Sequence, residues 1–191
     1  MMWMMRCLHY SRAITTDARV SKERETKEKH KVKDIILSVD ESIGSTGVAV
    51  FKGDKLIAAK KIETGSDMSF NDRMNVIETQ LRELVKKYKV TVFLAEDVYA
   101  NKSIMSYRYN LFIQGMLFSL SKNVKDSIYA LYHPTHWRKI LGMDVKGKKR
   151  PELKQMDIAY VKDHAGVITD SDDIADAICI GLAYIKEWSM Q

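Results

Sequence analysis

Four acidic residues stand where the catalytic site of an α/β protein would need them. Asp40 and Glu96 each end a short run of apolar, mostly branched residues, as a carboxylate does when it follows a buried strand. An α/β sheet presents the residues at the carboxyl ends of its strands to a ligand crevice. Asp173 and Asp176 lie three positions apart at the start of the last helical segment, so they share one helix face.

Carboxylates that converge on one crevice are suited to metal chemistry. Mg²⁺ prefers hard oxygen ligands in octahedral geometry, and two such ions about 4 Å apart can activate a water and stabilise the leaving oxygen of a phosphodiester. Each acid also has a simpler explanation. Asp40 can cap a turn, Glu96 can be a solvated strand end, and acids at a helix N-terminus complement its dipole without any metal. The residues alone leave both explanations open.

The elements that position these acids follow from hydrophobic periodicity. We expect five strands and five helices; the strands lie at 35–39, 48–51, 56–62, 90–95 and 128–132, and the helices at 71–88, 103–120, 135–141, 152–164 and 171–188. Gly53 and Asp54 form the predicted hairpin turn between the second and third strands. This order predicts an α/β fold with a mixed five-stranded sheet and helices on both faces.

The first part of the chain differs from the rest. A charged run occupies 19–33, and such a run cannot bury itself, so we expect a disordered or poorly ordered extension over residues 1–31 and one domain over 32–191. The alternative is an organelle-targeting peptide over residues 1–16, which contain arginines but no acid. No run of about 18 apolar residues is present, which excludes a transmembrane helix, and we expect a cytoplasmic protein. Two cysteines exclude a disulfide scaffold.

A stretch rich in basic residues lies between the acidic segments. The net charge is +6, and six basic residues cluster with one acid between them: Arg138, Lys139, Lys146, Lys148, Lys149 and Arg150. Neutralised phosphates release counterions, which supplies much of the affinity of proteins for DNA. Because the stretch lies between the acidic segments, we predict that it binds DNA. A solvated loop is the alternative.

The segment 103–120 is apolar nearly all round, and one sheet can cover only one side of a helix. A second copy of the chain would cover the other side in a homodimer. The alternative is a helix sandwiched between the sheet and the final helix.

In their order along the chain, these motifs resemble RuvC-type Holliday junction resolvases. The matching segments are 36–40 with 44–49, Leu94 to Tyr99, Gln114-Gly115, His133-Pro134 with Trp137 to Lys139, and Asp173 to Ala177. They span roughly Lys33 to Trp188, and the chain is most similar to the compact resolvases of phages of Gram-positive bacteria. The sequence departs from the family at Ser42, where a glycine is usual, with Glu41 beside the site, and in the extra acids Asp170 and Asp172.

The resemblance implies an RNase H-like fold, a homodimer, and Mg²⁺-dependent nicking of paired strands at a four-way DNA junction. It implies two Mg²⁺ ions per site, with Mn²⁺ as a substitute, and by motif match the ligands are Asp40, Glu96, Asp173 and Asp176. It also implies that Tyr99 stacks on an unpaired base at the junction centre. Lys149 and Arg150 match the basic residues that approach the scissile phosphate.

Three other functions are alternatives. A nuclease of RNA–DNA hybrids or flaps would use the same fold, and a non-catalytic protein could bind branched DNA. The segment 40–47 could also be the phosphate loop of an actin-like sugar kinase or ATPase. Such an enzyme needs a second glycine-rich loop, and residues 92–101 contain no glycine.

Overall fold

A computed structural model describes residues 34–97 and 103–189. The predicted N-terminal extension and Tyr99 lie outside these residues. The strands are β1 (Ile35–Asp40), β2 (Ser45–Lys52), β3 (Lys55–Glu63), β4 (Val92–Glu96) and β5 (Ile128–Tyr132). The helices are α2 (Phe70–Tyr88), α3 (Ile104–Lys122), α4 (Pro134–Leu141), α5 (Arg150–Ala165) and α6 (Asp172–Ser189).

The five strands form one mixed sheet in the order β3-β2-β1-β4-β5. The strands β1, β4 and β5 are parallel, whereas β2 runs antiparallel to both of its neighbours. The hairpin between β2 and β3 turns at Gly53, whose φ of 60° favours glycine. The predicted mixed five-stranded sheet is therefore confirmed.

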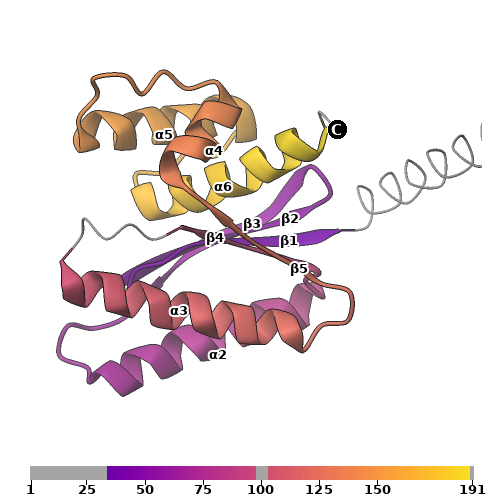
Figure 1. Cartoon of the computed structure of the whole chain (residues 1–191), viewed down its shortest axis with the longest axis vertical. Helices are drawn as coiled ribbons and strands as arrows, with labels where there is room; N and C mark the ends of the chain where they lie inside the picture. The colour runs from indigo at the N-terminus through magenta and orange to yellow at the C-terminus, as the bar shows by residue number, and fades with distance from the viewer. Residues whose placement is uncertain (1–33, 98–102, 190–191) are drawn as a thin grey trace, which may run out of the picture. The chain divides into compact units, whose positions relative to one another are not determined.

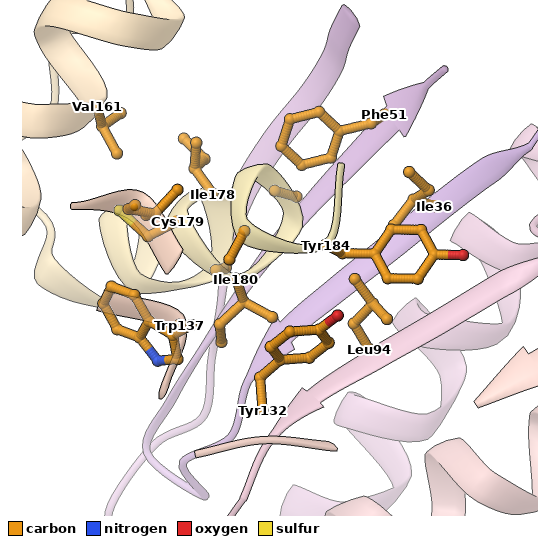
Figure 2. Close-up of a cluster of buried hydrophobic side chains, with 14 of the residues drawn as sticks. Ile36, Phe51, Leu94, Tyr132, Trp137, Val161, Ile178, Cys179, Ile180 and Tyr184 are labelled. Atoms are coloured by element: carbon orange, nitrogen blue, oxygen red, sulfur yellow. The ribbon is translucent and has the colours of Figure 1, made fainter. Parts of the chain in front are cut away.

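Helices cover both faces of the sheet (Figure 1). The helices α2 and α3 lie on one face, and α4, α5 and α6 lie on the other. Because the central strands are buried on both faces, their residues read as continuous apolar runs. In β1, Leu37 packs toward α2 and α3, while its neighbour Ile36 packs toward α6. Figure 2 shows the core on the side of α6, which includes Trp137 of α4 and Ile178 and Ile180 of α6.

Small residues bring α6 close to the sheet. The hydroxyl of Ser38 in β1 donates a 2.7 Å hydrogen bond to the carbonyl of Ala177. A Cβ atom added to Gly181 would lie 2.2 Å from the Phe51 ring, so the helix backbone approaches β2 closely at this point. These contacts fix the position of the helix that carries Asp173 and Asp176.

The helix α3 does not lie between the sheet and α6, since α6 covers the opposite face (Figure 1). The sandwiched alternative is therefore wrong. The outer side of α3 carries five large apolar side chains that are exposed: Ile104, Met105, Leu111, Phe112 and Phe118. None of the helices described is both long enough and apolar enough to span a membrane.

Candidate active site

The carboxyl ends of β1 and β4 place two of the predicted acids side by side. Val39 pairs with Ala95 in the parallel register of these strands, so Asp40 and Glu96 are neighbours at the same edge of the sheet. Asp176 reaches this point from the first turns of α6. One ligand oxygen from each of Asp40, Glu96 and Asp176 lies within 4.8 Å of the other two.

Asp173 does not belong to this group of three. Its carboxylate accepts a short hydrogen bond from the hydroxyl of Ser45 at the start of β2. Asp173 lies in the first turn of α6, where the helix backbone approaches Gly47 of β2. The structure thus gathers three of the four predicted ligands, and Asp173 as a ligand stays a prediction.

The extra acid Asp172 also has another role. Its carboxylate forms an ion pair with the ammonium group of Lys154 in α5. This pair links the first turns of α5 to the start of α6.

The electrostatics of Asp176 suit a cation. Burial raises the pKa of its carboxyl well above the usual 3.8, the nearby charges of Asp40, Asp157 and Glu96 raise it further, and Arg138 opposes them. Its Oδ1 atom is buried and accepts no hydrogen bond from the part of the chain that the structure describes. Carboxylate oxygens are the donors that hard divalent cations prefer. The donor set therefore fits a metal ion.

Two side chains of α4, Trp137 and Arg138, lie next to the carboxylates of Glu96 and Asp176. The indole Nε1 of Trp137 donates a 3.3 Å hydrogen bond to Oε1 of Glu96. Arg138 donates through Nε and Nη2 to both carboxylate oxygens of Asp157, and its Nη2 lies 3.8 Å from Oδ1 of Asp176. Burial opposes the charge of Arg138, but hydrogen bonding and attraction to Asp157 outweigh it and raise the guanidinium pKa.

The prediction that Arg138 belongs to a DNA-binding surface is therefore wrong. Only 8% of the residue is exposed, because its guanidinium faces inward to Asp157. Sequence reasoning also missed Asp157, which is fully buried in α5. One signal was available, because Asp157 stands four residues before the buried Val161 and so shares its helix face.

The side of the site toward α3 carries further polar contacts. The side-chain amide of Gln114 donates a 2.6 Å hydrogen bond to the backbone carbonyl of Glu96, which ties α3 to the end of β4.

Glu41, next to Asp40, is buried. Burial, with the charges of Glu41 and Asp97, raises the pKa of Tyr129 to about 12. Sequence analysis did not predict that Glu41 would be buried.

The other predicted basic residues are exposed. They run from the last turn of α4 to the first residue of α5: Lys139, Lys146, Lys148, Lys149 and Arg150. Lys154, one turn farther along α5, pairs with Asp172 at the start of α6. The basic segment therefore adjoins the end of α6 that carries Asp176.

The fold and the site define a class of protein. A mixed five-stranded sheet with acids from β1, β4 and the last helix is the RNase H-like fold that the sequence predicted, and its structural neighbours share it.

Comparison with known proteins points to one branch of this class. The chain is 25% identical over 154 residues to the crossover junction endodeoxyribonuclease RuvC of Brachyspira hyodysenteriae, covering 78% of this chain and 92% of the relative. It is 27% identical over 152 residues to the RuvC of Ehrlichia ruminantium, covering 75% and 94%. No family model matches the chain.

Among solved structures, Thermus thermophilus RuvC in complex with a Holliday junction substrate aligns with a TM-score of 0.69 and 14% identity. The alignment covers 82% of this chain and 96% of that one. The resemblance to RuvC-type resolvases is thereby confirmed. A particular similarity to phage resolvases stays a prediction.

Proposed function

We propose that this protein is a metal-dependent endonuclease that resolves four-way DNA junctions by paired nicks. The observation that carries the proposal is the convergence of Asp40, Glu96 and Asp176 at the carboxyl edge of the sheet. The similarity to RuvC over most of the chain supports it. The enzyme would act in the cytoplasm of a bacterial or phage-infected cell, where its substrate lies.

Asp40, Glu96, Asp173 and Asp176 would hold Mg²⁺, two ions per site, with Mn²⁺ as a substitute. Bound, the metal supplies a nucleophilic water at neutral pH and stabilises the leaving oxygen of the phosphodiester. The protein's part is to hold the carboxylates at one point and to position the DNA strand. The hydroxyl of Ser45 donates to Oδ2 of Asp173, and since a carboxylate has two oxygens, Asp173 would bind the metal without losing this hydrogen bond.

The basic segment from Lys139 to Arg150 would hold the DNA backbone beside this site. Its exposed lysines offer cations to phosphates, and the N-terminus of α5 adds backbone N–H groups and a favourable dipole. In the proposal Tyr99, which follows the end of β4 in the sequence, would stack on a base. Asp157 neutralises Arg138 in the interior, so Arg138 has no part in DNA contact.

A second copy of the chain would cover the apolar side of α3. Phe112 stacks edge-on against Phe70 at 5.4 Å between ring centroids, yet 52% of the residue remains exposed. Resolution of a nearly two-fold symmetric junction needs two identical sites, and a C₂ dimer supplies them. Burial of this face contributes about 25 cal/mol per Å² of apolar surface before the costs of association.

Cleavage of a panel of synthetic DNAs in Mg²⁺ tests the proposal. We expect paired nicks in a four-way junction, with little cleavage of a linear duplex, a flap or an RNA–DNA hybrid. Faster cleavage of the hybrid or the flap would replace the proposal with the corresponding nuclease. Binding of the junction without any metal-dependent cleavage would indicate a non-catalytic protein, although carboxylates close to DNA phosphates oppose binding unless a cation offsets them.

A further inference from the structure

The metal ligands of the proposed site are in contact with a buried polar group to which the sequence motifs gave no role at the metal. It consists of Trp137 and Arg138 in α4 and Asp157 in α5. We propose that these three are positioning residues, which hold the side chains of Glu96 and Asp176 in place for the metal. This inference rests on the proposed function. It means that the carboxylates of Glu96 and Asp176 are already in position before a cation binds.

Trp137 orients Glu96. The tryptophan is fully buried in the core that it shares with side chains of α6, which fixes its ring (Figure 2). An indole has one hydrogen-bond donor, its Nε1–H, and no acceptor. Because the ring is fixed, this N–H points in one direction, toward Oε1 of Glu96. Of the two oxygens of Glu96, Oε1 is held by the indole, and the carboxylate cannot rotate freely. The ring of Trp137 packs in the core, and its N–H donates to the proposed metal ligand Glu96.

Arg138 and Asp157 do the same for Asp176. The guanidinium is held by a two-pronged hydrogen bond to Asp157 and lies 4.0 Å above the Trp137 ring. With its direction fixed on two sides, Nη2 places positive charge 3.8 Å from Oδ1 of Asp176. This is close enough to attract the carboxylate but too long for a hydrogen bond, so the oxygen keeps its capacity to bind a cation.

The ion pair between Arg138 and Asp157 is better explained by its position beside the metal ligands than by a contribution to stability. A buried ion pair is weak evidence for stability, because desolvation offsets much of its attraction. Residues that hold metal ligands typically change metal affinity or activity about 10–100-fold when they are mutated. Trp137 and Arg138 are consecutive in α4. This one helix therefore contacts both Glu96 at the end of β4 and Asp176 in α6.

The test uses Mn²⁺ binding to the full-length protein, measured by calorimetry without DNA, and the metal dependence of junction cleavage. Trp137→Phe keeps an aromatic ring and removes the indole donor. We expect its affinity for Mn²⁺ to fall about 10- to 100-fold, with most of the cleavage rate restored at saturating metal. A folded variant with the affinity of the wild type would overturn the proposal.

A double variant tests the second pair. Arg138→Gln with Asp157→Asn removes both charges together, so that neither remains buried alone. The same decrease in Mn²⁺ affinity is expected, and an unchanged or higher affinity contradicts it. This variant also decides the question if Trp137→Phe does not fold.

Tyr132→Phe is the matched control. It removes another donor from the same core, the hydroxyl that donates to Glu187 at 2.6 Å, and Glu187 is not among the proposed metal ligands. Its Mn²⁺ affinity should equal that of the wild type, and an equal loss in this variant would assign the effect to the core instead. Wild-type protein that binds Mn²⁺ but cuts no junction would refute the proposed function alone, and wild-type protein that binds no Mn²⁺ would refute both.

Discussion

Gly47 of β2 and Asp173 of α6 lie in backbone contact. A Cβ atom added to Gly47 would lie 1.9 Å from the carbonyl oxygen of Asp173, closer than any side chain can tolerate. Ser45, two residues earlier, holds the carboxylate of the same aspartate. The start of α6 can therefore approach β2 closely because Gly47 has no side chain. This contact fixes the position of Asp176 relative to Asp40 and Glu96.

Gly47→Ala should displace the first turn of α6. The neighbour is backbone and cannot rotate away, so we expect a loss of about 1–3 kcal/mol in the free energy of unfolding and a loss of cleavage. Chemical denaturation and junction cleavage measure the two effects. For stability alone, Gly115→Ala in α3 is the control, since nothing in the same chain lies within 4 Å of its added Cβ, and it should stabilise the helix by up to about 1 kcal/mol. Normal activity in Gly47→Ala would contradict the close contact.

Asp176→Asn should stabilise the metal-free protein while it abolishes cleavage. The folded state raises the pKa of this carboxyl, so the native protein binds more protons than the unfolded chain and loses stability as pH rises above about 4. The amide removes that cost at neutral pH. Thermal unfolding in EDTA at about pH 7.5 should give a higher Tm for the variant. A lower Tm would show that the carboxylate is stabilised by its surroundings.

Neutralising the basic segment should weaken DNA binding uniformly. The triple variant Lys148→Ala, Lys149→Ala and Arg150→Ala should flatten the dependence of log K on log salt by about 0.9 for each phosphate that is no longer neutralised. The matched control removes three exposed lysines from the opposite face of the sheet, in and just after α2: Lys86, Lys87 and Lys89. Its salt slope should equal that of the wild type. Equal slopes in both variants would mean that the segment is only a solvated loop.

Phe112→Glu should convert the proposed dimer into a folded monomer. Half of this residue is exposed, so a charge here opposes association more than folding. Sedimentation at micromolar concentration measures the change. Ile57→Glu, on the β3 edge and 38% exposed in the wild type, controls for a charge on an apolar surface position. A wild-type protein that is strictly monomeric and still makes paired cuts would refute the dimer.

The sequence predicted the parts of the site that depend on local pattern. Asp40 and Glu96 were visible because each ends an apolar run, and parallel strands bring such ends together. Arg138 was misassigned because a basic residue beside other basic residues resembles a surface. Its partner Asp157 lies 19 residues away in another helix, and only tertiary packing brings the two together. The bond between Ser45 and Asp173 spans 128 residues and was equally invisible.

Asp40→Asn tests the central claim most directly, that the converging carboxylates hold the metal that cuts DNA. Cleavage and binding of one four-way junction are measured in the same preparation, in Mg²⁺ and in EDTA. Because the amide keeps the size of the side chain but loses its charge, cleavage should fall by about a hundredfold or more while junction binding remains. Substantial Mg²⁺-dependent cleavage by Asp40→Asn would contradict the account.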